Sequence, residues 1–162
     1  MTERVVDRDP APEPSLEYSL EYLFTRETRV RREVIGLVGE GFRVNVITEG
    51  GEVRGPALAG TCGFGADWFT LRRDGVGTVD SRITIHSADG AVLHSYYTGV
   101  ADFGEDALER IERGEVPEPG LIHVAARFQT SASRYTWMNR IQAVGIGRSR
   151  PTGNLWETYA LR

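Results

Sequence analysis

The sequence has a single cysteine, Cys62, no long apolar run and none of the common catalytic signatures. One cysteine excludes an internal disulfide and a zinc site built from several cysteines. No apolar stretch approaches the ~20 residues that a membrane-spanning helix needs, and we expect no signal peptide. The GxSxG, Walker and HExxH motifs are missing. We therefore expect a cytoplasmic protein that uses no metal and no cofactor.

The chain also has little net charge, −4 over 162 residues. This balance argues against nucleic acid and against an anionic membrane surface as partners. Hydrophobic residues make up 40% and charged residues 26%, which is typical of a globular protein. Residues 1–15 are charged and rich in proline, so we predict a flexible tail followed by one domain over residues 16–162. Whether this domain forms a homo-oligomer is left open by the sequence.

Two Asp-Gly pairs divide the middle of the chain into three extended runs. Asp74-Gly75 separates WFTLRR from VGTVDSRITIHS, and Asp89-Gly90 separates that run from AVLHSYYTGV. Asp-Gly between extended runs is a strong hairpin signal, because glycine accepts the positive φ that a tight turn demands. Val, Ile, Thr, Tyr and Trp in the runs suit a pleated sheet. We predict a meander of three antiparallel strands here.

The rest of the chain is also β-like. Residues 16–30 fit either a helix or a strand, and we favour a strand over residues 17–25, with a second extended piece from Arg29 to Leu37. Residues 41–48 alternate as a strand, which Glu49-Gly50-Gly51 should turn back. Residues 102–120 form an acidic excursion with one short helix, either a lid over a barrel mouth or a solvated connection. Three further runs are expected to be strands: LIHVAARFQT, IQAVGIGRS and LWETYALR. The segment SASRYTWMNR between the first and the second run is expected to form a turn or one helical turn.

These elements predict an all-β protein of about eight or nine antiparallel strands. No long helix and no alternation of strands with helices is expected. A closed or nearly closed barrel is the economical way for such a chain to avoid exposed sheet edges.

One strand carries polar residues that need an explanation. Between residues 78 and 86, one face is largely apolar, whereas Asp80 and Arg82 lie together on the other. The simple interpretation is a solvated outer face. The alternative is an internal ion pair, with Asp67 of the neighbouring strand nearby, since two carboxylates and a guanidinium in one cavity could divide acid and base roles. We predict this cavity, with tryptophans beside it.

Histidine and cysteine offer less. His86, His94 and His123 lie on three different expected strands and have no metal-ligand spacing. Surface or core positions explain them more simply. Cys62 has no local nucleophile signature and is expected to be a small buried residue.

Several motifs occur in an order that resembles a bacterial family, the domain-of-unknown-function 3237 family. They are GADW at residues 65–68, the DGV…D.R strand, the Y.G strand end and F.T…Y.W.N…VG.G. The resemblance runs from about Leu16 to the C-terminus. It implies a small β-barrel similar to allene oxide cyclase. The family's characteristic polar and aromatic positions fall here on Asp67, Trp68, Asp80, Arg82, Tyr97, Phe128, Tyr135, Trp137 and Asn139.

Related barrels serve as cofactor-independent cyclases, so the resemblance favours an isomerase, cyclase or lyase acting on a small apolar, polyketide-like or aromatic metabolite in the barrel lumen. Asp67 and Asp80 would be its acid and base, and Arg82 would stabilise an enolate or carboxylate. Trp68, Tyr97, Phe128, Tyr135, Trp137 and Asn139 would bind the substrate. The alternatives are a non-catalytic barrel that carries a hydrophobic metabolite, and a structural or interaction module with a packed interior.

Overall fold

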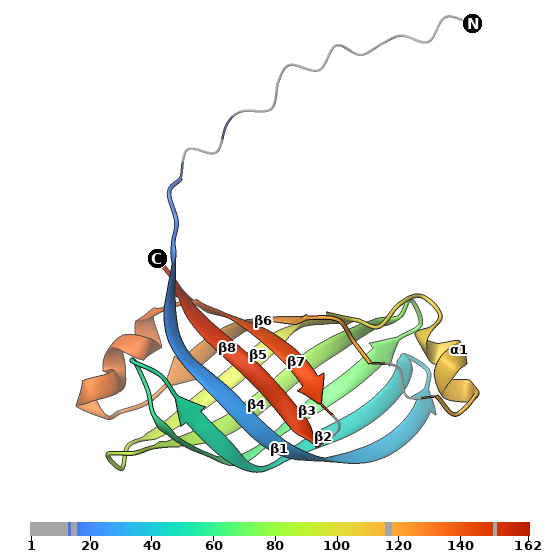
Figure 1. Cartoon of the computed structure of the whole chain (residues 1–162), viewed down its shortest axis with the longest axis horizontal. Coiled ribbons are helices and arrows are strands. Elements are labelled where there is room, and N and C mark those ends of the chain that lie inside the picture. The colour runs from blue at the N-terminus through green and yellow to red at the C-terminus, as the bar shows by residue number, and fades with distance from the viewer. Residues whose placement is uncertain (1–12, 14–15, 116–117, 151) are drawn as a thin grey trace, which may run out of the picture.

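The computed structural model describes residues 13, 16–115, 118–150 and 152–162, and it shows a closed barrel of eight antiparallel strands (Figure 1). The strands follow chain order around the barrel, and β1 closes the ring on β8. The prediction of an all-β antiparallel barrel is confirmed. Its strands are β1 (Leu20–Val38), β2 (Gly41–Arg54), β3 (Gly60–Arg72), β4 (Val76–Ser87), β5 (Val92–Asp102), β6 (Ile122–Gln129), β7 (Ala143–Arg150) and β8 (Gly153–Leu161).

The two Asp-Gly turns form as expected. Gly75 joins β3 to β4 with φ of 78°, and Gly90 joins β4 to β5 with φ of 89°. Both values lie in the left-handed region that glycine enters without a steric cost. The central meander β3–β4–β5 is therefore fixed by local sequence.

The first two strands are longer than expected. The runs assigned to residues 17–25 and 29–37 are one continuous strand, β1. The predicted turn at Glu49-Gly50-Gly51 is wrong, because β2 continues through it to Arg54. Arg29 of β1 pairs with Gly50, whereas Val30 pairs with Thr48, so Glu49 is the extra residue of a β-bulge. A bulge and a turn both favour glycine, which explains the error.

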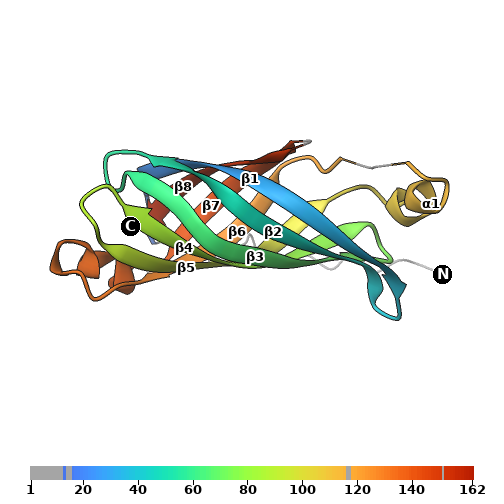
Figure 2. The ribbon, with the colours of Figure 1, turned by 90° about the horizontal axis from the view of Figure 1, so that it is seen from below.

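Two short helices lie at opposite ends of the barrel (Figures 1 and 2). The six-residue α1 (Ala107–Glu112) belongs to the acidic excursion, as expected. At the other end the 3-10 helix η1 (Ser133–Arg140) follows β6 and buries Tyr135 and Met138. Among the residues that the structure describes, no helix is long and apolar enough to cross a membrane. The tail predicted over residues 1–15 lies, except for Glu13, outside the described residues.

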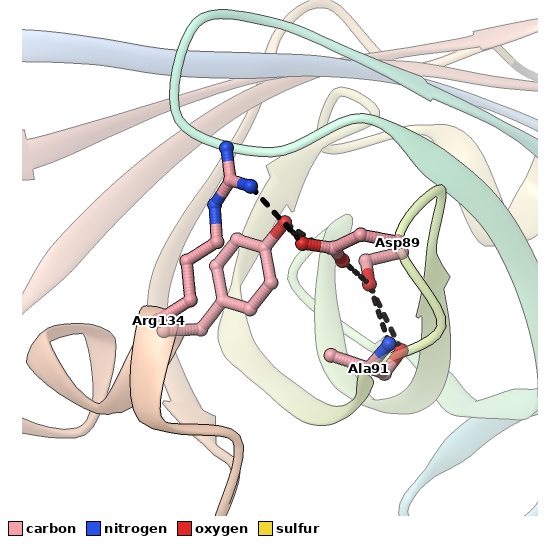
Figure 3. Close-up of polar contacts among 5 residues, drawn as sticks. Asp89, Ala91 and Arg134 are labelled. Atoms are coloured by element: carbon pink, nitrogen blue, oxygen red, sulfur yellow. Dashed lines mark hydrogen bonds and ion pairs between the residues drawn. The ribbon is translucent and has the colours of Figure 1, made fainter.

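A polar network fastens η1 to the turn between β4 and β5 (Figure 3). The Tyr135 hydroxyl donates to both carboxylate oxygens of Asp89 at 3.1 Å, and Arg134 lies 3.3 Å from the same carboxylate. The Ser87 hydroxyl also donates to Asp89 and accepts from the Ala91 amide at 2.8 Å. The Ser87 and Tyr135 hydroxyls lower the pKa of Asp89. This network holds η1 against the β4–β5 turn at one end of the barrel.

Apolar and aromatic side chains fill much of the interior. Phe128 packs edge-on against Phe24 and Tyr97, with ring centroids 5.9 and 6.4 Å away. Trp156 of β8 lies flat against β7, and a Cβ added to Gly147 would stand 2.5 Å from its ring. Glycine at this position therefore makes room for a large aromatic side chain inside a narrow barrel.

Candidate functional site

Asp67, Ser81 and Tyr97 form an inward-facing row across three neighbouring strands. Asp67 of β3 is paired with Ser81 of β4, which is paired with Tyr97 of β5. Residues paired across a ladder lie on the same face of the sheet. Ser81 and Tyr97 are buried, so this face is the interior. The structure therefore brings Asp67 into the barrel, in line with the sequence prediction.

Arg26 of β1 joins this row from the opposite wall. β1 and β5 lie four strands apart in the eight-strand ring, yet the Arg26 guanidinium carbon is 4.3 Å from the centre of the Tyr97 ring. The same carbon is 5.5 Å from the centre of the Trp156 ring. Arg26 is only 2% exposed. Its side chain thus crosses the lumen and places a positive charge between two aromatic rings.

Several polar atoms in this region are buried without a hydrogen-bond partner among the described residues. They are Nε and Nη1 of Arg26, the Tyr97 hydroxyl and the Thr158 hydroxyl. Thr158 lies two residues from Trp156 on β8 and is 1% exposed. Buried polar groups are nearly always paired, since each unpaired one costs about 1–3 kcal/mol. A bound ligand is one source of the missing partners.

The carboxyl group of Asp67 has an unusual proton affinity. Burial raises its pKa from 3.8 to about 6, opposed by a hydrogen bond from the Asp80 amide. The charge of Asp80 adds to the rise, and the charge of Arg26 reduces it. The Asp80 amide lies 2.9 Å from Oδ1 of Asp67. A carboxyl group with this pKa exchanges a proton readily near neutral pH.

Cys62 also lies in the interior. It is buried, as predicted, and its burial raises the pKa of the thiol, an effect that the charge of Arg26 reduces. The described residues contain no group of three or more His, Cys, Asp or Glu side chains placed to hold a metal ion. The chemistry that Asp67 and Arg26 offer in this interior is proton transfer and anion binding.

Asp80 and Arg82 are not part of the interior. They form an ion pair of 2.8 Å on the outer face of the barrel, each side chain 48% exposed. The cavity predicted to hold them together with Asp67 is wrong. The apolar face of β4 turns inward instead, as Val79, Ile83 and Ile85 are all buried.

Trp68 accompanies them on the outer face. It is 39% exposed, and its ring lies 5.6 Å from the guanidinium carbon of Arg82. The ring of Tyr96 lies 6.0 Å from the same carbon. Trp68 therefore does not line the interior predicted for it.

Of the remaining predicted substrate-binding residues, three are buried and two are not. Tyr97 and Phe128 are buried inside the barrel, and Tyr135 is a buried residue of η1. Asn139 is exposed and bonds the backbone amide and carbonyl of Thr130 at 2.9 and 2.8 Å, which is a structural role. Trp137 is partly buried, with the guanidinium carbon of Arg162 5.8 Å from its ring. Its ring therefore packs against the C-terminal residue.

Sequence reasoning missed Arg26, Trp156 and Thr158. Trp156 and Thr158 alternate with Ala160 along β8, so their shared face was visible in the sequence. Arg26 shares a face with Phe24 and Thr28, but it was placed just beyond the end of a shorter expected strand. Only the full length of β1 shows that this arginine points inward.

Comparisons with known proteins agree on the fold and the family. The model of a family described as a protein of unknown function, DUF3237, matches residues 18–161. A UPF0311 protein of Bradyrhizobium diazoefficiens is 31% identical over 120 residues, covering 72% of this chain and 79% of that protein. The crystal structure of a β-barrel-like protein from Acinetobacter baumannii has a TM-score of 0.78 at 22% identity, covering 93% of this chain and 100% of the other.

A fourth comparison involves a protein described as an enzyme. The crystal structure of an enzyme from Penicillium herquei has a TM-score of 0.70 at 22% identity, covering 93% of this chain and 99% of that one. At this identity the similarity concerns the fold alone. Since the family model spans nearly the whole barrel, the chain belongs to the DUF3237 family.

Proposed function

We propose that the protein is a cofactor-independent enzyme of the isomerase, cyclase or lyase type. Its substrate is a small, largely apolar metabolite, polyketide-like or aromatic, held in the barrel interior. The observation that carries the proposal is the combination of Asp67, a carboxyl group with a pKa of about 6, and the buried guanidinium of Arg26 in one interior. Perturbed titratable groups concentrate at catalytic sites.

Asp67 acts as the general base. Its carboxylate takes a proton from an acidic C–H of the substrate, which leaves an enolate on the substrate and a carboxylic acid on Asp67. Return of that proton to a different carbon completes an isomerisation. General acid–base catalysis by a positioned group contributes typically about 10²–10⁴ in rate.

Arg26 stabilises the negative charge that develops on the substrate oxygen. A fixed cation in a dry interior needs little reorganisation when that charge forms. Asp80 takes part through its backbone amide, which orients Oδ1 of Asp67. Its own carboxylate remains on the outer face with Arg82.

The enzyme from Penicillium herquei supports an enzymatic use of this type of barrel. A non-catalytic carrier for a hydrophobic metabolite is the second candidate. The Tyr97 and Thr158 hydroxyls, which have no hydrogen-bond partner among the described residues, favour it, because they serve ligand binding without any chemistry.

Hydrogen–deuterium exchange separates the two candidates. Wild-type protein is incubated in D₂O with enolisable probes such as benzoylacetone and 2-tetralone, without added cofactor, and exchange at the acidic carbon is followed by proton NMR. We expect exchange faster than in buffer, with a rate that rises as the pH passes about 6 and Asp67 ionises. Binding of the probes with exchange only at the buffer rate would favour the carrier.

A further inference from the structure

We propose that the interior site takes a small aromatic or conjugated organic anion, whose carboxylate or ionised oxygen is bound by Arg26. This inference rests on the proposed function in that it names the substrate class of the same site. It is carried by separate observations, namely the burial of Arg26, the two guanidinium nitrogens that lack a partner among the described residues, and the rings around them.

The first observation is a buried positive charge whose hydrogen bonds are incomplete. Arg26 is 2% exposed, and its Nε and Nη1 have no hydrogen-bond partner among the described residues. A charge removed from water is costly unless it is paired and hydrogen-bonded. A guanidinium also offers planar donors that match a carboxylate. An anionic ligand supplies the missing acceptors.

The second observation is the shape of the surroundings. The guanidinium carbon lies 4.3 Å from the Tyr97 ring centre and 5.5 Å from the Trp156 ring centre. Phe128 packs beside Tyr97 with ring centroids 6.4 Å apart. Aromatic walls with a few polar groups are typical of sites for flat apolar ligands. The Tyr97 and Thr158 hydroxyls provide additional groups for an oxygen-bearing ligand.

The third observation concerns the side of the barrel where β1 leaves β8. The β1–β8 ladder ends at Arg29 and Gly153, whereas the β1–β2 ladder continues to Val38 and Gly41. A hollow of about 380 Å³ lies at this point. It is lined by Thr28, the residue that alternates with Arg26 along β1, and by Asn154, which alternates with Trp156 along β8.

Charge at this side suits an anion. The hollow is lined by three arginines and two glutamates, of which Arg54 is paired with Glu52 and Arg150 with Glu27, so Arg29 supplies its excess positive charge. Arg32 spans from β1 to the end of β7, with Nη2 3.3 Å from the Ser149 hydroxyl and 3.2 Å from the Arg150 carbonyl oxygen. A surface with an excess of arginine attracts anions and raises their rate of association.

Binding of matched probes tests the inference. Benzoate, cinnamate and 2-naphthoate are each compared with their uncharged amides by isothermal titration at pH 7.5, with quenching of tryptophan fluorescence as a second readout. We expect at least one carboxylate to bind wild type about tenfold or more tightly than its amide. Arg26→Gln should bind the carboxylate with an affinity about tenfold or more below that of wild type, whereas its affinity for the amide should change little.

Arg82→Gln is the matched control, because Arg82 also lies beside aromatic rings but on the outer face. It should leave carboxylate binding unchanged. Absence of any preference for carboxylates in wild type, or equal loss in both variants, would overturn the proposal. If Arg26→Gln does not fold, the affinity of wild type for carboxylates relative to their amides tests the proposal by itself. Asp67→Asn should keep carboxylate binding, so a failure of the catalytic proposal is seen separately.

Discussion

Asp67→Asn is expected to reduce turnover of an identified substrate by about 10²–10⁴, because the amide cannot accept the substrate proton. Asparagine has nearly the same volume, and its side-chain oxygen can still accept the hydrogen bond that the Asp80 amide donates to Oδ1 at 2.9 Å. The fold and the binding of ligand should therefore persist. Steady-state kinetics together with circular dichroism would measure the loss and verify the fold.

Asp80→Asn is the informative control for this prediction. The sequence favoured Asp80 equally as acid or base, whereas the structure places its carboxylate outside with Arg82. The substitution keeps the backbone amide that orients Asp67, so most of the turnover should remain. Loss of turnover in Asp80→Asn with full turnover in Asp67→Asn would refute the proposed assignment.

Arg26→Met is expected to stabilise the folded protein while ligand binding is lost. Methionine is long, flexible and apolar, so it fills similar space without a buried charge. Replacing buried charges with apolar residues often raises the free energy of unfolding by about 1–4 kcal/mol. The lost contacts with the Tyr97 and Trp156 rings lower it by up to about 2 kcal/mol. We expect a net gain of about 1–2 kcal/mol, or a melting temperature higher by several degrees.

The comparison is best made at pH 5, where Asp67 with a pKa of about 6 is mostly protonated and Arg26 compensates little negative charge. Arg82→Met serves as control, since an exposed ion pair contributes about 0–1 kcal/mol. If Arg26→Met instead lowers the melting temperature markedly, Arg26 is a structural residue and its burial is no sign of a binding site.

The fold was largely predictable because its signals are local. Asp74-Gly75 and Asp89-Gly90 each need only a few residues to specify a tight turn, and both form. Gly50 and Gly51 were misread because their pairing partners lie on β1, more than twenty residues away. Alternation along a strand defines two faces but does not say which one is buried.

The site was predictable only in part, because the sequence does not show which face of each strand is buried. In β4 the sequence correctly separates Asp80 and Arg82 from the apolar face, yet which face points inward depends on how the whole barrel closes. Asp67 was found because it follows a glycine-rich stretch next to Trp68. Arg26 was missed because a single arginine on a long strand gives no signal of burial. Its contact with Tyr97 joins opposite walls of the barrel, which no local pattern can show.

The pKa of Asp67 also has a consequence for stability. A carboxyl group whose pKa is raised by folding stabilises the folded state below its unfolded pKa of 3.8, and this contribution is lost as the pH rises through about 6. Each pK unit corresponds to about 1.4 kcal/mol, so the full loss is at most about 3 kcal/mol. Retaining such a costly carboxylate at neutral pH is what a functional role would explain.

Titration of the Asp67 carboxyl carbon by ¹³C NMR, assigned by comparison with Asp67→Asn, tests the central claim most directly because it needs no substrate. The claim is that Asp67 and Arg26 act on one another inside a single buried site. It predicts a pKa of about 6 in wild type and a higher value in Arg26→Gln, since the charge of Arg26 lowers this pKa. A pKa near 4 that Arg26→Gln leaves unchanged would contradict it.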